Sequence, residues 1–291
     1  GDLLDLTAPG AAEWMESEIA RVFTENEVEF FKLDHNTPVT DHAQTEQTGF
    51  TENISWRYYE TLYGIYERLR QRFPNVYFQN CAGGGGRTDI GLMRHFYDTL
   101  VSDWHVAPRS FSIFNGMTMA LPPEYCNGLL GEGVRGHQAA SLDFQARILL
   151  FGHPLVAFLN PVPSQLNPVQ AERVRHMVHL YKTFVRRYLR DGRIFHHTPV
   201  VTGPEPQGWG VLELASRDRL RAIVGLFQLA TPNAQEYLLR VRGLDAGRRY
   251  RVTFDNDGQT SEVDGLVLMK QGLVIRVEAP LASELLLFEA V

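Results

Sequence analysis

The stretch Val28-Glu29-Phe30-Phe31-Lys32-Leu33 decides the fold, because it is a short apolar, strand-like run with a carboxylate, Asp34, directly at its end. Thr99-Leu100-Val101-Ser102 repeats this arrangement ahead of Asp103. In a barrel of parallel strands the carboxyl ends open onto one face, where catalytic groups collect. Two aspartates at such positions can face each other across a pocket, as glycosidic bond cleavage requires.

Strand-like and helix-like runs alternate on either side of this stretch. We expect strands at 28–33, 76–78, 100–101 and 155–159, helices at 15–23, 54–72, 90–96, 141–151 and 168–190, and an irregular region rich in Gly and Pro at 115–136. This alternation is typical of a parallel α/β sheet or barrel.

The pattern changes after Thr198-Pro199. Short runs with turn signals between them predict strands at 210–214, 220–227, 237–241, 249–254, 266–269, 273–277 and 284–288. This spacing favours an antiparallel β-sandwich. Because Pro199, Pro204 and Pro206 make a stiff linker, we expect a catalytic barrel-type domain over residues 1–200 and a sandwich over 201–291.

Bulk properties exclude several classes of partner. The formal charge of -6 over 291 residues argues against nucleic acid and anionic membranes as partners.

The compartment is indicated only weakly. Only Cys81 and Cys126 are present, which favours a reducing compartment. No apolar stretch is long enough for a membrane span. Because the sequence begins with Gly1 rather than a methionine, the absence of a signal peptide says little, and a cytoplasmic location is only an expectation.

Asp34 has two interpretations. Asp-His-Asn-Thr-Pro is also a sequence that favours a turn, so the carboxylate can simply cap a loop. The catalytic interpretation depends on Lys32, which shares a face with Asp34 because side chains at i and i+2 of a strand point the same way. A neighbouring ammonium favours the ionised carboxylate that a nucleophile needs, and Asn36 can donate to sugar hydroxyls.

Asp103 also has two interpretations. It can cap the helix that follows, or it can act as a general acid, since an aromatic neighbour such as Trp104 can desolvate a carboxyl group. Arg109 can contact a ligand or pair with a surface acid.

A glycine-rich segment, Gly83 to Gly86, follows Cys81 and precedes Arg87-Thr88-Asp89. It matches neither GxGxxG nor a P-loop, so a phosphate cradle is weakly supported. The alternative is that glycines such as Gly84 let the backbone approach a bound sugar, with the Cys81 thiol beside it. His176 and His179 lack the carboxylates or the HExxH pattern of a zinc site, so we expect neither metal nor cofactor.

Together, these sequence motifs resemble those of glycoside hydrolase family 36, the retaining α-galactosidases and their relatives. Lys32-Leu33-Asp34-His35-Asn36 is similar to the family's Lys-Trp-Asp-Met-Asn motif, and the segment from Cys81 to Asp89 is similar to its Cys-Ser-x-Gly-Gly-x-Arg-x-Asp loop. Ser102-Asp103 with Arg109 resembles its Ser-Asp motif and following arginine. The segments 239–245 and 265–269 are similar to its closing β-sandwich.

The resemblance implies a (β/α)8-type barrel, an α-galactoside substrate and a double displacement, with Asp34 as nucleophile and Asp103 as general acid/base about 5–5.5 Å apart. The residues expected to contact substrate are Lys32, Asn36, Cys81, Gly84, Trp104 and Arg109.

Several positions depart from the family pattern. Leu33 and His35 replace Trp and Met, Gln79 stands where many members have an acid, and Trp104-His105 replaces polar residues. The mechanism is therefore better supported than the substrate.

Only five or six strand candidates precede the linker, whereas a closed barrel has eight. We therefore expect the chain to be the later part of a longer protein, or to be completed by another copy in a homo-oligomer. Two alternatives stay open: a transglycosylase of the raffinose-synthase kind, and an incomplete, inactive sugar-binding fragment.

Overall fold

The structure, a computed structural model, describes residues 3–37, 44–47, 50–104, 106–130, 140–156, 167–201, 203–229 and 235–291. The chain divides into two compact units, residues 1–100 and residues 101–291. Among the described residues no helix is long and apolar enough to cross a membrane.

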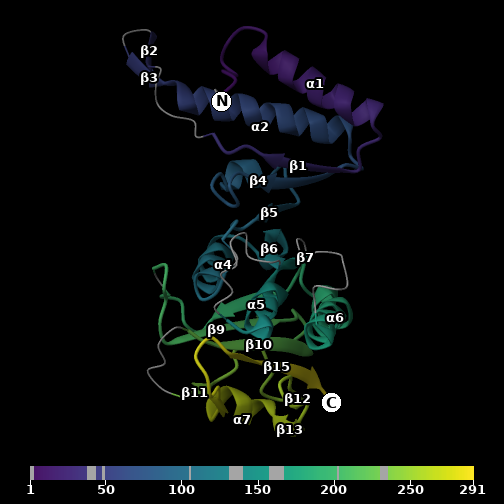
Figure 1. The fold of residues 1–291 in the computed structure, drawn as a ribbon, viewed down its shortest axis with the longest axis vertical. Helices are drawn as coiled ribbons and strands as arrows, with labels where there is room; N and C mark the ends of the chain where they lie inside the picture. Colours follow the sequence, from purple (N-terminus) through teal and green to yellow (C-terminus); the bar gives the residue numbers. More distant parts are fainter. Residues whose placement is uncertain are drawn as a thin grey trace. The chain divides into compact units, whose positions relative to one another are not determined.

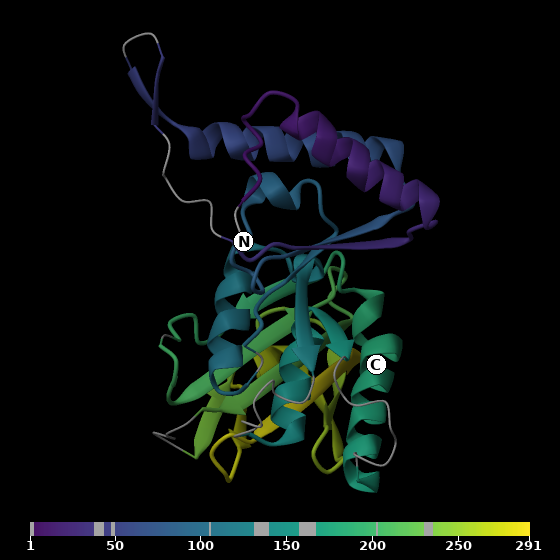
Figure 2. The same cartoon turned by 45° about the horizontal axis from the view of Figure 1, so that its top comes forward.

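The first unit is a layer of helices on a parallel sheet. Its strands β1 (Phe30–Asp34), β4 (Tyr77–Cys81) and β5 (Asp98–Leu100) pair in that order and run parallel. Its other elements are α1 (Ala11–Glu25), α2 (Ile54–Arg72), the short α3 (Ile90–Met93) and a hairpin of β2 (Gln44–Gln47) and β3 (Phe50–Asn53). The helices α1 and α2 lie side by side on the same face of β1 and β4 (Figures 1 and 2).

Aromatic side chains fill the space between these helices and the sheet. The ring of Phe23 on α1 lies 5.1 Å from that of Phe31 and 5.8 Å from that of Phe78. Phe31 and Phe78 are register partners on β1 and β4, so they share the helix-facing side of the sheet. Because side chains alternate along a strand, Lys32 and Asp34 lie on the opposite face.

The second unit begins with a barrel-type part. Strands β6 (Cys126–Leu130) and β7 (His153–Val156) run parallel. The helices here are α4 (Arg109–Ala120), α5 (Leu142–Ile148) and α6 (Pro168–Thr183), with single 3₁₀ turns at Pro123–Tyr125, Leu149–Phe151 and Val185–Arg187. The strand predicted at 155–159 is observed as β7 up to Val156, and 157–159 lie outside the described residues.

The prediction of an irregular region over 115–136 is wrong up to residue 130. This segment contains the end of α4 and the wholly buried strand β6. Gly128 suggested a loop. An isolated glycine inside a strand can instead mark a position that a neighbouring side chain approaches closely. A Cβ atom at Gly128 would overlap a methyl carbon of Leu149. Residues 131–136 lie outside the described part of the chain.

The C-terminal part is antiparallel, as predicted. Six strands pair in the order β13-β12-β15-β10-β9-β8, and β11 pairs with β14. Their bounds are β8 (Arg193–His196), β9 (Trp209–Ala215), β10 (Arg221–Gln228), β11 (Glu236–Leu239), β12 (Arg249–Phe254), β13 (Thr260–Asp264), β14 (Leu273–Arg276) and β15 (Ser283–Ala290). The division at 200/201 stays a prediction, and β8, which precedes it, pairs with β9 beyond it.

The strands β9, β10 and β15 of the six-stranded sheet are buried on both faces. On β15, Leu285 and Leu287 belong to a core shared with α4, α5 and α6, whereas Leu286 and Phe288 belong to a second core beneath α7 (Gly265–Lys270) and the β11–β14 pair. This explains the continuous apolar sequence of β10 and β15, since a strand covered on both faces does not alternate.

The strand predicted at 266–269 is wrong, because these residues form α7. Leu268 is buried but Leu266 is 54% exposed, although both would share one face of a strand. A short apolar run does not distinguish a strand from a buried helical turn. The predicted helix at 90–96 is limited to α3, and that at 168–190 ends at Thr183.

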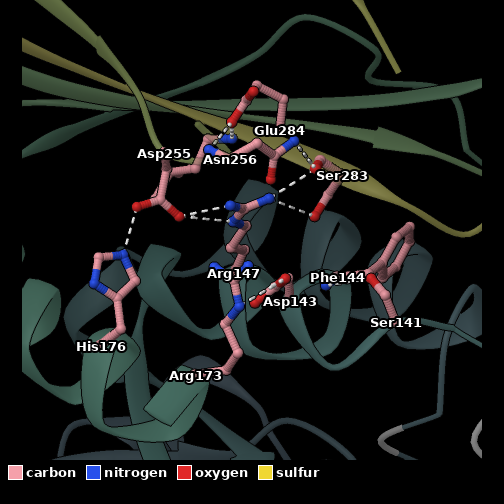
Figure 3. A network of polar contacts seen from close by, with 11 residues as sticks. Ser141, Asp143, Phe144, Arg147, Arg173, His176, Asp255, Asn256, Ser283 and Glu284 are labelled. Carbon is pink, nitrogen blue, oxygen red and sulfur yellow. Dashed lines mark hydrogen bonds and ion pairs between the residues drawn. The ribbon is translucent and has the colours of Figure 1, made fainter. Parts of the chain in front are cut away.

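A buried polar network ties α5 and α6 to the antiparallel sheet (Figure 3). Arg147 on α5 donates to the Asp255 carboxylate at 2.6 Å and to the Ser283 carbonyl oxygen at 2.7 Å. His176 on α6 contacts the other carboxylate oxygen of Asp255. The Arg147 and Asp255 side chains are only 4% and 7% exposed.

Candidate active site

In the first unit the site is built on the polar face of β1 and β4. Lys32 pairs in register with Gln79 and Asp34 with Cys81, so all four side chains lie on the same face. Lys32 and Asp34 are exposed, whereas Gln79 and Cys81 are buried. The predicted juxtaposition of Lys32 and Asp34 on one strand face is therefore present.

Cys81 lies beside Asp34 as its register partner on the neighbouring strand. Burial raises the pKa of its thiol, and so does the nearby Asp34 carboxylate, whereas the Gly84 backbone and the Lys32 charge lower it. The net effect is upward, so the thiol keeps its proton.

The glycine-rich loop that follows β4 turns back on itself. The Ala82 amide donates to the Gly84 carbonyl oxygen at 2.8 Å, and Gly83 and Gly84 have φ angles of +57° and +77°. Side chains are strained at such angles, which explains the glycines. A Cβ atom at Gly83 would lie 3.6 Å from Oδ1 of Asn36, so the Asn36 amide lies over this loop.

The loop is poorly suited to a phosphate. It leads to α3, whose first turn is already capped, because Leu92 N–H donates to Asp89 Oδ1 at 2.8 Å. This carboxylate would repel a phosphate at that position. The geometry therefore favours the alternative, in which the backbone makes room for a neutral ligand.

Sequence reasoning missed a group formed by His35, Tyr58 and Arg87. The Arg87 guanidinium contacts both ring nitrogens of His35, and the Tyr58 hydroxyl lies 3.4 Å from His35 Nε2. Burial, with the Arg87 charge, lowers the pKa of His35 to about 4. His35 is thus neutral at neutral pH, and Arg87 remains the local cation.

A second missed feature lies on the same sheet face as Lys32. Gln79 Nε2 donates to Asp98 Oδ1 at 3.0 Å, and both side chains are almost fully buried. Asp98 is the register partner of Gln79 on β5. No local signal marked Asp98, because it precedes the predicted strand and becomes part of this face only through the pairing.

In the second unit Asp103 lies in an exposed turn. The Trp104 amide donates to Ser102 Oγ at 2.9 Å, and the Trp104 ring is stacked by the Arg109 guanidinium, 4.6 Å from its centre. The helix α4 begins at Arg109 with Pro108 as its N-cap. The interpretation of Asp103 as the helix cap is therefore wrong. Trp104 is 49% exposed, so an aromatic face is available beside the carboxylate.

The two groups supply different chemistry. Around Asp34 there are donors for hydroxyl oxygens from Lys32 and Asn36. Around Asp103 there is an indole against which a ring can pack. Among the residues that the structure describes, no cluster of three or more His, Cys, Asp or Glu could hold a metal ion.

Parallel strands that end in polar residues, followed in the chain by an antiparallel sandwich, are the architecture of a barrel-type enzyme with a closing domain. Residues 2–192 match the Melibiase family, and residues 209–288 match the Glycosyl hydrolase family 36 C-terminal domain. The chain belongs to glycosyl hydrolase family 36, and the predicted family resemblance is confirmed.

Curated relatives include several α-galactosidases. The chain is 26% identical over 258 residues to α-galactosidase AgaA of Geobacillus stearothermophilus, covering 86% of this chain and 34% of the relative. It is 28% identical over 254 residues to an α-galactosidase of Escherichia coli, covering 86% and 34%. The chain thus spans about a third of the length of these relatives.

Solved structures share the fold. An AgaA variant from G. stearothermophilus in complex with raffinose superposes with a TM-score of 0.84 at 22% identity, covering 99% of this chain and 39% of that one. The α-galactosidase from Lactobacillus brevis gives 0.82 at 23% identity, covering 99% and 39%. The predicted fold class, later strands of a (β/α)8-type barrel followed by an antiparallel sandwich, is confirmed.

Proposed function

We propose that this chain carries the catalytic carboxylates of a retaining α-galactosidase, with Asp34 as the nucleophile and Asp103 as the general acid/base. One observation carries the proposal: Asp34 stands at the end of β1, on the face of Lys32 and beside its register partner Cys81. Family membership and the α-galactosidase names of the relatives support the reaction and the substrate class.

The proposed reaction is a double displacement. Asp34 attacks the anomeric carbon while Asp103 protonates the leaving glycosidic oxygen, and Asp103 then removes a proton from the water that releases the sugar from Asp34. This scheme requires the two carboxyl groups to stand about 5–5.5 Å apart in the working enzyme.

The surrounding residues have roles in binding. Lys32, Asn36 and the protonated Cys81 thiol contact hydroxyls of the galactose unit, and the backbone at Gly84 leaves room for the ring. Trp104 packs against the sugar, and Arg109 holds the indole in place from its other side. Neutral His35 can accept a hydrogen bond from Arg87, which fixes this cation close to the loop.

The test is hydrolysis of p-nitrophenyl α-D-galactoside, with the β-anomer as specificity control. If the gene encodes a longer product, the same variants are made in that product. Asp34→Ala and Asp103→Ala should each lower kcat by at least about a thousandfold. Azide should rescue Asp34→Ala with inversion, giving a β-galactosyl azide, because a small anion can replace a missing nucleophile in a single displacement. Asp257→Ala, in an exposed turn of the sandwich, is the matched control. Normal turnover by Asp34→Ala would refute the assignment.

Product analysis separates hydrolysis from transfer to a sugar. Chromatography of products formed from raffinose, with and without added sucrose, should show free galactose as the main product. Transfer that outpaces hydrolysis at low acceptor concentration would make the chain a transglycosylase instead. Measuring the molecular mass in solution alongside the assay shows whether activity accompanies a homo-oligomer.

A further inference from the structure

Three polar side chains form a row across the sheet of the first unit, one on each strand. Lys32 on β1 is the register partner of Gln79 on β4, and Gln79 is the register partner of Asp98 on β5. Register partners project to the same side of a sheet, so all three lie on the face that carries Asp34. Because Lys32 precedes Asp34 by two residues on β1, this row lies next to the proposed nucleophile.

Asp98 is the buried end of the row. It is 2% exposed and Gln79 is 3% exposed, and Gln79 Nε2 donates to Asp98 Oδ1 at 3.0 Å. A carboxylate at this depth loses most of its hydration, which costs free energy unless donors or a cation compensate for it. A side chain so deeply buried does not reach a sugar, so any effect of Asp98 on the site passes through its neighbours.

The carboxylate of Asp98 fixes the orientation of the Gln79 amide. Carboxylate oxygens accept hydrogen bonds, so the NH₂ group of Gln79 faces β5. The amide is planar and carries its oxygen on the other edge, so Oε1 is turned away from β5. An ammonium only donates, and the Lys32 ammonium on the neighbouring strand therefore complements this oxygen.

Lys32 is the only basic residue in β1, β4 and β5. Its charge acts across the strand pair: burial raises the pKa of the Cys81 thiol, and the Lys32 ammonium opposes that rise. A lysine side chain is a long, flexible stem without a preferred direction of its own. A negative charge on the same face therefore helps to decide where the ammonium rests.

We propose that Asp98 is a positioning residue of the galactose site, which acts through the Gln79 amide to hold the Lys32 ammonium beside Asp34. The inference rests on the proposed role of Lys32 as a donor to a galactose hydroxyl. Asp98 itself does not contact the substrate. It orders a flexible donor before the sugar arrives, which lowers the entropy cost of binding.

The kinetic test uses the p-nitrophenyl α-D-galactoside assay. Asp98→Asn removes the charge but keeps an acceptor for Gln79, so the fold should be retained. We expect KM to rise about tenfold and kcat to change less than about threefold, because Lys32 binds the sugar equally in the ground state and the transition state. A fall in kcat at unchanged KM would overturn the proposal.

A Lys32→Met background decides whether Asp98 acts through the lysine. In this background Asp98→Asn should change KM by less than about twofold, because the group that it positions is gone. The same tenfold rise in both backgrounds would overturn the proposal. Glu67→Gln removes an exposed carboxylate from α2, on the other face of the sheet, and is the control that should leave KM unchanged.

A double apolar variant separates positioning from support of the fold. Gln79→Met/Asp98→Leu removes both members of the buried hydrogen bond, and replacing both partners by apolar groups of similar shape is nearly neutral for stability. The Tm should stay within a few degrees of that of the unaltered chain, whereas KM should again rise about tenfold. An unchanged KM in this variant would show that the pair only supports the fold, and would overturn the proposal.

The signal of Lys32 itself provides a readout that does not depend on turnover. The chain has only three lysines, Lys32, Lys182 and Lys270, so ¹³C-lysine labelling resolves each Cε in a ¹H–¹³C spectrum, and Lys32→Met assigns the first. Asp98→Asn should shift the Lys32 signal and leave the other two in place; an unshifted Lys32 signal would overturn the proposal. A shifted signal in a chain that fails to hydrolyse α-galactosides would contradict only the proposed function.

Discussion

Glu213 carries the most deeply buried carboxylate of the sandwich, with 0% exposure. It accepts from the backbone N–H groups of Arg242 and Gly243 and contacts Nε2 of His197 at 2.7 Å. A buried charge is tolerated when several donors satisfy it. Glu213 therefore fixes the segment after β11 against β9.

Replacement of Glu213 should reveal this dependence. Glu213→Leu leaves two backbone amides and His197 without their acceptor, so we expect the free energy of unfolding to fall by about 3–5 kcal/mol. Glu213→Gln, which keeps one carbonyl oxygen, should cost less. Urea denaturation measures both, and Glu236→Gln, in an exposed ion pair with Arg276, should stay within about 1 kcal/mol. Equal small effects at both positions would contradict this account.

His35 should make the stability of the chain pH-dependent. Burial and Arg87 lower its pKa from 6.5 to about 4 in the folded state. Between these values the unfolded chain binds more protons than the folded one, so the free energy of unfolding decreases as the pH falls from 7 towards 4. The decrease in Tm between pH 7 and pH 5 should be smaller in His35→Gln. His179→Gln, exposed on α6, should not change it; an identical slope in both variants would argue against the depressed pKa.

At the scale of elements, Arg147 joins α5 to β12 and β15 through Asp255 and Ser283 (Figure 3). The pair is buried, so removal of one partner leaves an uncompensated charge. Arg147→Met or Asp255→Leu should each lower the free energy of unfolding by about 3–5 kcal/mol.

The double variant tests whether the residues act as a pair. Arg147→Met/Asp255→Leu should cost clearly less than the sum of the single changes, since neither charge is then left alone. Arg175→Met, from an exposed pair with Glu172 on α6, is the control and should cost less than about 1 kcal/mol. Strict additivity of the two buried changes would show that their contact contributes little.

For the whole molecule, regular periodicity predicted most of the fold. The helix at 54–72 agrees with α2 at both ends, because a long run of apolar residues on one face is a strong signal. The predictions at β6 and α7 are wrong because tertiary packing overrides the local sequence pattern there. The Leu149 side chain leaves space only for a glycine at position 128. At α7, Leu268 is buried because it packs into the second core.

The candidate site was predicted less completely. Lys32, Asp34 and Cys81 could be found because they end strands and match a family motif, and the structure places them on one sheet face. His35 with Arg87, and Gln79 with Asp98, come together only through strand pairing and loop geometry. A linear pattern contains no information about such partners, so these contacts could not be predicted from the sequence alone.

The six-stranded sheet makes the sandwich dependent on the helices before it. A chain limited to residues 201–291 would expose Leu285 and Leu287 and lose β8, so we expect it to bind a hydrophobic dye and to melt at lower temperature than residues 101–291. Circular dichroism and dye fluorescence on the two chains check this. A cooperative transition at the same temperature in both would show that the second core suffices.

The two faces of β15 are therefore constrained by different parts of the sequence, one by helices before residue 200 and the other by elements after it. A mutation at Leu285 requires compensation on α5 or α6, whereas one at Leu286 requires it beneath α7. Recombination between homologous genes at residue 200 would separate the first set of partners, so viable chimaeras should have crossover points upstream of α4 instead.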